Sequence, residues 1–406
     1  MKKKILFVIN TMGRAGAEKC LMSMLKYMDK DKYDISLFSV INRGEMFDYV
    51  PEGVRILNEN PCSLSVLDRK AKKELAKTIL KNGFRKGYFF KEAGYLRKTI
   101  SYQRKRGEID FKKLFWKLLS DHAPKQKETY DLAVAYIQGA ATYYVMDHIH
   151  AKKKITFLHN EFIDSGYCPE LEETYYEQAD GIYCVSKSIC DHFAKIYPKM
   201  AGKMDVFYNL LDVEDIKQKA LQKDDMSPLF QKKEGETILL TAARLAPVKA
   251  YDLAVPALAI VRKQGYNVKW YVLGDGPEKD AIKGMIKEYG LEDSFILLGA
   301  HKNPYPYMAA CDIYVQATRY EGCCTSISEA VILGKPVIAS DCDGNKEQLT
   351  RYETGIFVAL NAEDIARGII QMVSDRELSQ KLVEQANMDD FDPYGSLRRI
   401  YRYVEG

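Results

Sequence analysis

Short runs of consecutive apolar residues recur along the whole chain and alternate with longer segments that have helical periodicity. The runs are apolar throughout instead of alternating with polar positions, which is the pattern of parallel strands covered by helices on both faces. In the first half they lie at residues 5–10, 34–40, 131–137, 154–160, 181–186 and 205–209. In the second half they lie at residues 237–243, 268–274, 294–299, 312–317, 336–340 and 355–359. Two such series predict two doubly wound α/β domains.

The length of the chain agrees with two domains, since 406 residues exceed what a single hydrophobic core usually supports. A charged segment with a proline and little periodicity, residues 221–236, marks the expected boundary. We therefore expect one Rossmann-like domain over residues 1–222 and a second over residues 223–390. A turn signal followed by one short helix forms the tail, residues 391–406, and the pattern alone does not say where this helix docks.

A basic insert, at about residues 63–128, interrupts the alternation of strands and helices. Residues 69–127 contain 19 Lys/Arg and 5 Asp/Glu, so that this segment carries +14 in a chain of net charge +4. Apolar residues within it recur at the spacing of one helical face, with lysines opposite: Phe111, Leu114, Phe115, Leu118 and Leu119 on the face, and Lys112, Lys113 and Lys117 opposite. Such a helix suits an anionic membrane surface. Packing of the apolar face on the domain, with solvated lysines, is the alternative that stays open.

Other classes of protein are disfavoured by the composition. No apolar run approaches the roughly 20 residues that span a bilayer, and the basic and then apolar residues 1–10 are better explained as a buried strand than as a signal peptide. A cytoplasmic protein is expected, with attachment to the inner face of the membrane left open by the insert. The nine cysteines are scattered without a C-x-x-C pair, so neither a zinc site nor a disulfide framework is expected. No nucleic-acid-binding motif accompanies the basic charge.

A glycine turn follows the first predicted strand. Gly13 and Gly16 precede a helical pattern, so backbone N–H groups at this turn could face an anion or a sugar. The turn lacks the spacing of dinucleotide and Walker motifs, which argues against nicotinamide and ATP. A purely structural turn is the alternative.

Two cations follow the first strand of the second domain. Arg244 and Lys249 lie on the loop that leaves this strand, and α/β sheets bind ligands at the carboxyl ends of their strands. Their chemistry suits a diphosphate, with arginine as a fork and lysine as a point charge. The alternative is a solvated surface pair. The next strand ends in a further glycine turn, residues 273–278.

Two glutamates, Glu321 and Glu329, flank a run of small residues in the segment 319–340. Ser326 and Glu329 match a capping box, which places Glu329 in the first turn of a helix and Glu321 on the preceding loop. Free amides at the start of this helix could meet a phosphate. Glu329 could serve only as a cap, but Glu321 has no comparable structural explanation.

Together these segments resemble the retaining glycosyltransferases of family four, which have the GT-B fold of two Rossmann-like domains facing across a cleft. The resemblance is carried by GRAGAE at 13–18, ARLAPVKAYDL at 243–253, LGDGPE at 273–278 and GKPVIASDCDGNKEQL at 334–349, and by the E-x7-E signature on Glu321 and Glu329. It departs from the family at Ala250, where a glycine commonly follows the lysine, and in the first loop, which keeps one of two paired glycines. Asp341 and Asp343 form a D-x-D pattern, which is interpreted as a chance match within a loop and not as a metal site.

The resemblance implies a role for each candidate residue. Arg244 and Lys249 would hold the donor diphosphate, Glu329 the ribose, and Glu321 the donor sugar, with His159 near the reaction centre. Further donor contacts would come from small or backbone-exposing positions: Gly16, Gly274, His301, Gly322, Cys323, Cys324 and Thr325. The C-terminal helix would cross back to complete the first domain.

The expected function is therefore that of a hexosyltransferase that moves a sugar from a nucleotide-diphosphate sugar to a glycan or lipid-linked acceptor with retention, without a metal. The resemblance favours a UDP-sugar as donor and synthesis of a cell-surface polysaccharide as the setting, and it leaves the sugar and the linkage open. A nucleotide-sugar epimerase of the same architecture and a non-catalytic partner of a transferase are the alternatives.

Overall fold

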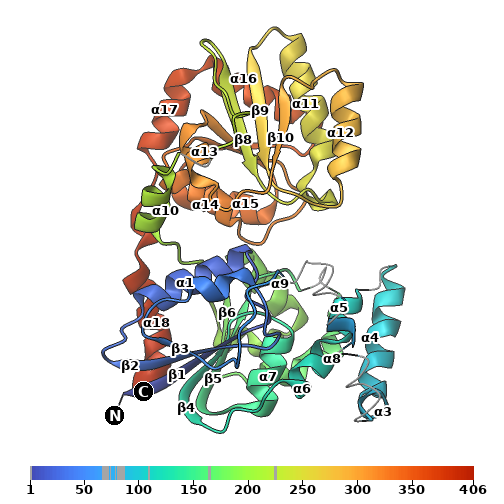
Figure 1. Ribbon diagram of the computed structural model, residues 1–406, viewed down its shortest axis with the longest axis vertical. Helices are drawn as coiled ribbons and strands as arrows, with labels where there is room; N and C mark the ends of the chain where they lie inside the picture. Colours follow the sequence, from blue (N-terminus) through green and yellow to red (C-terminus); the bar gives the residue numbers. More distant parts are fainter. Residues whose placement is uncertain are drawn as a thin grey trace. The chain divides into compact units, whose positions relative to one another are not determined.

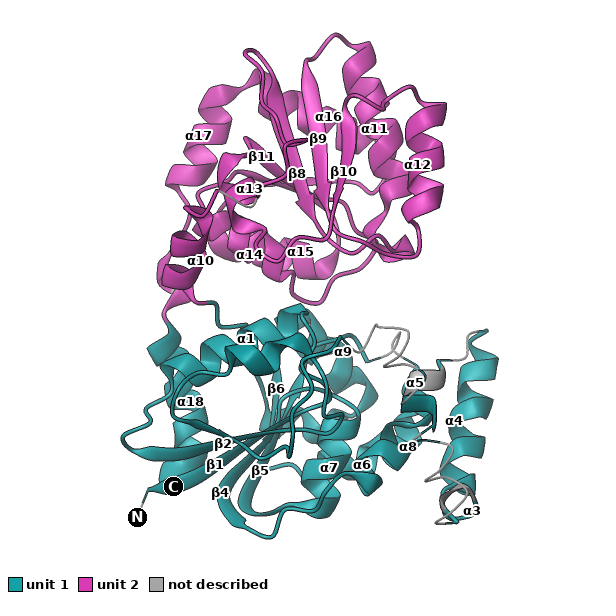
Figure 2. Ribbon diagram, viewed as in Figure 1, with its two compact units in different colours: residues 1–211, 393–406 teal, residues 212–392 magenta. Residues whose placement is uncertain are grey.

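The computed structural model describes residues 2–65, 73, 75–77, 79, 87–107, 110–162, 166–223 and 226–406. The chain divides into two compact units, unit 1 with Met1–Leu211 and Pro393–Gly406, and unit 2 with Asp212–Asp392 (Figure 1, Figure 2). Helix α10 (Val213–Ala220) packs on α13 (Tyr305–Ala310) and α14 (Thr325–Ile332), and so lies in unit 2. No helix in the described ranges is long and apolar enough to cross a membrane.

Unit 1 is built on a parallel sheet with the strand order β3-β2-β1-β4-β5-β6-β7. Its strands are β1 (Lys3–Ile9), β2 (Tyr33–Ser39), β3 (Val54–Ile56), β4 (Thr129–Ala135), β5 (His150–Leu158), β6 (Gly181–Cys184) and β7 (Met204–Val206). The chain winds outward in both directions from the neighbours β1 and β4. The order therefore reverses between these two strands, and a crevice at their carboxyl ends is where such sheets bind ligands.

Helices cover both faces of the sheet of unit 1 (Figure 1). The described helices are α1 (Gly16–Tyr27), η1 (Glu45–Tyr49), α3 (Tyr88–Lys91), α4 (Ala93–Lys105), α5 (Phe111–Leu114), α6 (Trp116–His122), α7 (Ala140–His148), α8 (Pro169–Glu177), α9 (Lys187–Ile196), η3 (Pro198–Lys203) and α18 (Pro393–Glu405). Ile5, Phe7 and Ile9 of β1 share a core with α1 and α18, while α7 packs on β1 and β4. The C-terminal helix α18 is thus part of unit 1.

Unit 2 repeats this architecture with the parallel strand order β10-β9-β8-β11-β12-β13. Its strands are β8 (Thr237–Ala242), β9 (Val268–Leu273), β10 (Phe295–Gly299), β11 (Ile313–Gln316), β12 (Val337–Ser340) and β13 (Ile356–Val358). The order reverses between β8 and β11. The carboxyl ends of these two strands are the expected ligand position of unit 2.

The remaining helices of unit 2 are η4 (Pro247–Lys249), α11 (Tyr251–Lys263), α12 (Lys279–Glu288), α15 (Asp343–Tyr352), α16 (Ala362–Ser374), α17 (Arg376–Glu384) and η5 (Asp389–Phe391). Helices α11, α12 and α16 share a core with the strands, and α14 packs on β11 and β12. In this core the indole N–H of the buried Trp270 donates to Thr241 Oγ1 at 2.9 Å, so the one polar atom of the ring is satisfied.

The predicted α/β architecture is confirmed in each unit. All twelve apolar runs coincide with strands, because strands buried on both faces give the continuous apolar pattern. The prediction missed β3, whose three residues, Val54, Arg55 and Ile56, alternate apolar and charged at the edge of the sheet.

The predicted single helix over residues 111–119 of the basic insert is wrong. Helix α5 ends at Leu114 and α6 begins at Trp116, with Phe115 between them at φ −106° and ψ 0°. The break brings the indole of Trp116 against the backbone of Gly139, where ring atom Cδ1 lies 3.1 Å from the position that a Cβ would take. Tertiary packing has therefore overridden the helical periodicity.

The lysines of this segment are not simply solvated. Lys117 Nζ lies 2.8 Å from Asp121 and 2.9 Å from Asp147, and its side chain is only 14% exposed. Lys113 pairs with Asp110 at 3.5 Å and lies over the ring of Tyr167. Both ammonium groups thus make ion pairs with carboxylates of unit 1. The side chains of Phe111 and Lys112 lie outside the described part of the structure.

Candidate functional site

The loops that follow β8 and β11 meet at the strand-order reversal of unit 2. The loop after β8 carries Lys249 at the end of η4, and the loop after β11 carries Glu321. Lys249 Nζ is in hydrogen-bonded contact with Glu321 Oε2, although the residues are 72 positions apart. The side chains are 16% and 20% exposed, so the pair is mostly shielded from water.

The charge of Lys249 is maintained by its surroundings. Burial alone would lower the pKa of the ammonium group, but neighbouring acidic groups, Glu321 among them, outweigh it, and the pKa lies above its ordinary value. Burial also raises the pKa of the Cys324 thiol, so that this group is neutral near pH 7. Glu321 is therefore the anion that pairs with Lys249 at neutral pH.

Hydrogen bonds hold these two loops together. Thr318 Oγ1 donates to the carbonyl oxygen of Val248 at 2.9 Å, and the Arg319 N–H donates to the same oxygen at 2.8 Å. The Arg319 guanidinium contacts both carboxylate oxygens of Asp252, at 3.0 and 2.6 Å. The spacing of Lys249 and Glu321 is thus set by the backbone of both loops and by Thr318, whose side chain is fully buried.

Ala250 follows Lys249 and has the left-handed backbone conformation, with φ 47° and ψ 39°. This conformation costs an L-residue about 1–2 kcal/mol, and glycine adopts it without that strain. The geometry explains why a glycine would suit this position. At the position noted as a departure, Ala250 thus has a backbone conformation that glycine would adopt without strain.

Arg244 lies on the same loop as Lys249 but differs in environment. It is exposed, and the described residues include no acidic partner for its guanidinium. The glycine turn after β9 crosses the loop directly beneath it, because a Cβ at Gly274 would lie 1.9 Å from the carbonyl oxygen of Ala243. A Cβ at Gly276 would likewise meet the carbonyl oxygen of Leu245, at 2.1 Å. Both glycines permit the close approach of the two loops.

Glu329 does not form the predicted capping box. Helix α14 begins at Thr325 with Cys324 as N-cap, so Glu329 lies beyond the first turn, and the N-cap makes no side-chain hydrogen bond. Ser326 Oγ donates instead to the carbonyl oxygen of Ala242 at the end of β8, at 3.0 Å. Glu329 is 2% exposed, and its Oε1 accepts a hydrogen bond from the Tyr305 hydroxyl at 3.0 Å. The carboxylate is therefore held by a side chain of α13.

The start of α14 is fixed by α15. Gln348 accepts a hydrogen bond from the Cys324 N–H at 2.7 Å and donates to the Cys324 carbonyl oxygen at 2.9 Å. Gly344 lies against the Glu321 loop, because a Cβ there would meet the carbonyl oxygens of Glu321 and Gly322 at 2.2 and 2.7 Å. Gly322 is buried, whereas Cys323 and Thr325 are partly exposed. Helix α15 thus supports the whole segment between the two glutamates.

The ring of His301 is held at the surface by neighbouring polar groups. Its Nδ1 lies 3.1 Å from the Tyr307 hydroxyl, and its Nε2 lies 3.3 Å from the carbonyl oxygen of Leu298. Tyr307 belongs to α13, the helix that also carries Tyr305. His301 is therefore fixed to the helix that positions Glu329.

The remaining predicted residues lie at the carboxyl edge of the sheet of unit 1. Gly16 begins α1, whose first turn carries the buried Glu18; burial raises the pKa of Glu18 to about 7, although a hydrogen bond from Thr11 opposes this shift. His159 follows β5, and burial lowers its pKa to about 3, although a hydrogen bond with the Tyr136 backbone opposes this shift. Its Nε2 atom is buried and has no partner in the described part of the chain. His159 is therefore neutral at physiological pH, and one of its ring nitrogens makes no hydrogen bond within the described residues.

Acidic groups that resemble metal ligands are already neutralised. Among the described residues one cluster has the spacing of a cation site, Asp121, Asp147 and His148, and the ammonium group of Lys117 contacts both of its carboxylates. Asp341, from the D-x-D pattern, pairs with Lys346 at 2.5 Å.

The structure brings Lys249, Glu321 and the start of α14 together in one place, and it fixes Glu329 one turn further along α14. Sequence reasoning missed the residues that hold this arrangement: Thr318, Tyr305 and Gln348. Each acts through a contact between distant segments, and no local motif marks it.

Comparison with known proteins connects this site to sugar transfer. Residues 222–388, less than half of the chain, match the family model of glycosyl transferases group 1. Over 235 residues the chain is 28% identical to the N-acetylgalactosamine-N,N'-diacetylbacillosaminyl-diphospho-undecaprenol 4-alpha-N-acetylgalactosaminyltransferase of Campylobacter jejuni, covering 57% of this chain and 61% of that protein. Over 242 residues it is 27% identical to the poly(ribitol-phosphate) alpha-N-acetylglucosaminyltransferase of Staphylococcus aureus, covering 59% and 46%.

The chain therefore spans about half to three fifths of the length of these curated relatives. Among solved structures it is similar to HepE of Anabaena in complex with UDP and glucose, with a TM-score of 0.65, 18% identity and 99% of both chains covered. At this identity the likeness concerns the fold. The chain thus has the GT-B fold of two Rossmann-like units, and its residues 222–388, which carry Lys249, Glu321 and Glu329, are similar to the group 1 glycosyl transferases.

Proposed function

We propose that the protein transfers a sugar from a nucleotide-diphosphate sugar to a glycan or lipid-linked acceptor, with retention at the anomeric carbon. The observation that carries the proposal is the contact of Lys249 with Glu321 at the strand-order reversal of a sheet whose sequence matches a glycosyl transferase family. A cation for phosphate and a carboxylate for hydroxyl groups, side by side at the carboxyl ends of β8 and β11, suit a sugar linked to a diphosphate.

Each residue then takes one part of the donor. Lys249 and the exposed Arg244 bind the diphosphate, and the backbone from Gly322 to Thr325 supports it together with the sugar. Glu321 accepts hydrogen bonds from sugar hydroxyls, and Glu329 accepts them from the ribose. Gly274 and His301 line the nucleotide through their backbones. The donor is a UDP-sugar in this proposal, which is supported by the structure of the Anabaena protein in complex with UDP and glucose.

The chemistry is that of leaving-group stabilisation. Charge develops on the departing diphosphate, where Lys249, Arg244 and the amides at the start of α14 would stabilise it. Of the carboxylates described at this site, Glu321 pairs with Lys249 and Glu329 is buried against Tyr305, so neither is placed as a nucleophile. Substitution on the same face is therefore proposed, with the leaving phosphate taking the proton of the acceptor. From unit 1, the neutral His159 would meet the donor sugar as a hydrogen-bonding group, and the loop at Gly16 would approach the diphosphate.

Kinetics of substituted proteins test this assignment. Wild-type protein is incubated with a panel of UDP-, GDP- and ADP-sugars, and release of the nucleoside diphosphate is measured with and without acceptor extracts. Arg244→Ala and Lys249→Ala should lower turnover by orders of magnitude, whereas Lys269→Ala, at the amino end of the sheet beside Glu236, should not. Turnover at the wild-type level in both site variants would refute the assignment of Arg244 and Lys249 to the donor diphosphate. Conversion of the donor without acceptor, followed by NMR, would indicate an epimerase.

The acceptor in this proposal is anionic. By their names, the two relatives act on a diphospho-undecaprenol-linked glycan and on poly(ribitol-phosphate). The setting proposed for this chain is the synthesis of a surface polysaccharide at the inner face of a membrane, with the protein attached peripherally.

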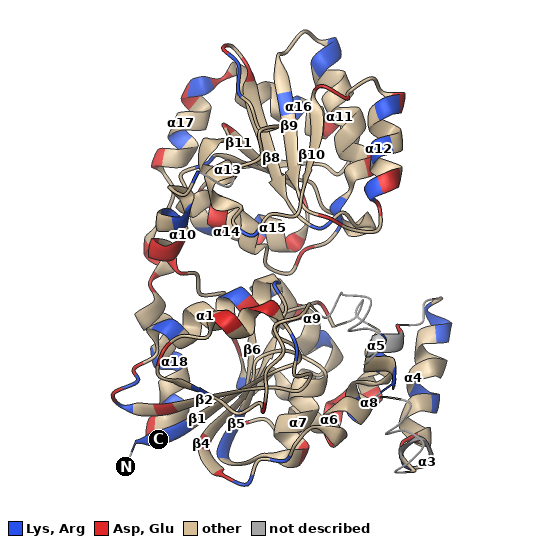
Figure 3. Cartoon of the chain, in the orientation of Figure 1, with Lys and Arg blue, Asp and Glu red and all other residues tan. Residues whose placement is uncertain are grey.

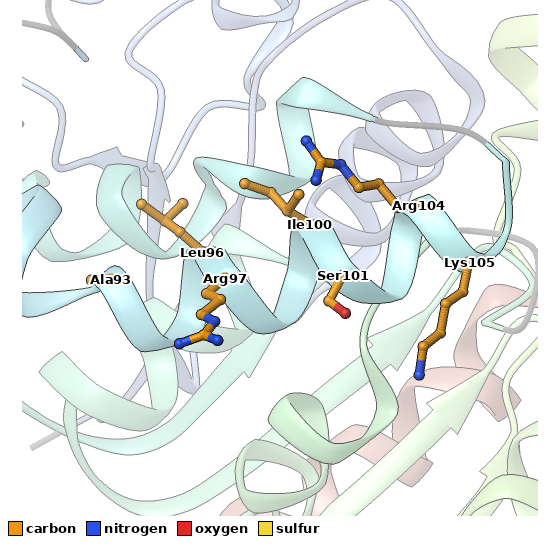
Figure 4. Close-up of a pocket in the computed structure, with 7 residues that line it drawn as sticks. All are labelled: Ala93, Leu96, Arg97, Ile100, Ser101, Arg104 and Lys105. Atoms are coloured by element: carbon orange, nitrogen blue, oxygen red, sulfur yellow. The ribbon is translucent and has the colours of Figure 1, made fainter.

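A described part of the basic insert offers a surface for such attachment. Between residues 87 and 107 there are six Lys/Arg and one Asp/Glu, and blue cationic segments recur along α4 in Figure 3. One side of α4 borders a hollow of about 820 Å³ with Leu96 and Ile100 among its lining residues (Figure 4). Arg97, Arg104 and Lys105 line the same hollow and have no acidic partner in the described ranges. Phe90, on the neighbouring α3, is 87% exposed.

Flotation with vesicles tests the membrane surface. Each basic residue near an anionic bilayer contributes about 1 kcal/mol, so replacing three of them by glutamine should lower binding to phosphatidylglycerol vesicles by about a hundredfold. The variant combines Arg97→Gln, Arg104→Gln and Lys105→Gln, and its control combines Lys279→Gln, Lys283→Gln and Lys287→Gln on α12. Equal, negligible binding of the wild type to anionic and neutral vesicles would remove the membrane claim.

A further inference from the structure

The two residues proposed to bind different ends of the donor neutralise each other in the structure. Lys249 Nζ contacts Glu321 Oε2, and no other carboxylate pairs with Lys249 in the described part of the chain. The contact is mostly buried, with 16% and 20% of the two side chains exposed. An ion pair in this setting is weakly screened by water and salt.

The pair cannot separate easily. Thr318 Oγ1 and the Arg319 N–H both donate to the carbonyl oxygen of Val248, so the loops that carry Lys249 and Glu321 are joined one residue away from the lysine. Gly344 fits against the carbonyl oxygens of Glu321 and Gly322, which restricts movement of that loop on its other side. A ligand that takes up Lys249 therefore meets Glu321 at short range.

A bare diphosphate and a diphosphate sugar differ in what they offer to Glu321. A diphosphate bound to Lys249 brings negative charge beside the carboxylate, which is unfavourable in a poorly hydrated site. A sugar on the diphosphate supplies O–H groups that can donate to Glu321 and replace the hydrogen bond lost from Lys249. The free nucleoside diphosphate supplies no such donor.

We propose that Glu321 competes with the diphosphate for Lys249 and so makes the site selective for the intact donor over its nucleoside diphosphate product. This inference rests on the proposed function of the site. Once the sugar has left with the acceptor, the hydroxyl donors to Glu321 are gone, the carboxylate returns to Lys249, and the product is displaced. Glu321 then has a role in product release in addition to contacting the sugar.

The test compares ligands with and without the sugar. Calorimetric titrations of wild type and Glu321→Gln use inorganic pyrophosphate, the nucleoside diphosphate of the donor that the wild type turns over, and that donor itself. Removing the carboxylate should tighten binding of pyrophosphate and of the nucleoside diphosphate by about tenfold, while the donor binds no more tightly than before. The matched control is Glu236→Gln, which removes a carboxylate from the Lys269 pair at the amino end of the sheet and should change none of these affinities.

A double variant identifies the cause. When Lys249→Met is also present, Glu321→Gln should tighten pyrophosphate binding by much less than tenfold, because the Lys249 ammonium group for which Glu321 competes is gone. Unchanged or weaker binding of pyrophosphate and nucleoside diphosphate by a folded Glu321→Gln protein would overturn the inference. Should that protein fail to unfold cooperatively on heating, Glu321→Ala carries the same prediction. A wild type that binds no nucleotide sugar at all would instead refute the proposed function.

Discussion

The hydroxyl group of Tyr305 gives the sharpest test of how the site is held. It donates to Glu329 Oε1 at 3.0 Å, and the two residues are 7% and 2% exposed. A hydrogen bond to a charged acceptor contributes about 1.5–3 kcal/mol, so Tyr305→Phe should lower the free energy of unfolding of unit 2 by that amount. For a unit of this size the melting temperature should fall by about 2–4 °C per kcal/mol.

The same substitution should weaken nucleotide binding. If Glu329 holds the ribose, loss of the hydroxyl group that fixes its carboxylate should raise KM for the nucleotide sugar by about fivefold to tenfold, a change of about 1–1.4 kcal/mol. The value of kcat should change much less, because Glu329 does not touch the bond that breaks. The assays are thermal unfolding and steady-state kinetics with varied donor.

Tyr271→Phe is the matched control for this experiment. Tyr271 is also a buried tyrosine of unit 2, and its hydroxyl bonds with the backbone of Gln231, away from the loops after β8 and β11. It should lose stability without a change in KM. If Tyr305→Phe lost stability in the same way but kept the wild-type KM, the assignment of Glu329 to the ribose would be refuted.

Three further substitutions test the surrounding structure. Gly344→Ala places a Cβ 2.2 Å from the carbonyl oxygen of Glu321 and should lower donor turnover at least about tenfold by displacing that loop, whereas Gly284→Ala, in open space on α12, should keep activity and gain up to about 1 kcal/mol of stability. Thr318→Val removes the hydroxyl group that donates to the carbonyl oxygen of Val248. It should lower the free energy of unfolding by about 1 kcal/mol and should also lower donor turnover. Turnover at the wild-type level would show that this hydrogen bond does not hold the two loops in place. Burial raises the pKa of Glu172 from 4.5 to about 8, so between these pH values the folded state keeps a proton that the unfolded state has released. The stability that this group contributes is therefore fully present below about pH 4.5 and is lost as the pH rises to about 8. Glu172→Gln should flatten that decline in urea titrations, and an unchanged slope would show that Glu172 is not protonated in the folded protein.

Much of the fold could be predicted from the sequence because parallel strands are buried on both faces. The run over residues 5–10 is apolar at every position until Asn10, and β1 forms there. The edge strand β3 was missed because Arg55 lies between Val54 and Ile56 and no continuous run exists. The helix break at Phe115 was missed because the packing of Trp116 on Gly139 joins segments that are distant in sequence.

The site was only partly predictable for the same reason. The positions of Lys249 and Glu321 at strand ends follow from the chain order and the location of ligands in α/β sheets. Their contact joins positions 72 residues apart and depends on the strand order, which brings β8 next to β11. The prediction of a capping box was wrong because Ser326 Oγ donates to the carbonyl oxygen of Ala242 in β8. Local sequence spacing cannot reveal a partner in a distant strand.

Equilibrium binding to Lys249→Met tests the central claim most directly. The claim is that the loops after β8 and β11 bind the diphosphate of a nucleotide sugar, and Lys249 is a mostly buried cation between them. Titration with the nucleoside diphosphate of the active donor should show affinity at least about tenfold weaker than wild type, with a folded protein and with Lys269→Met unchanged. Equal affinity in wild type and Lys249→Met would contradict the account.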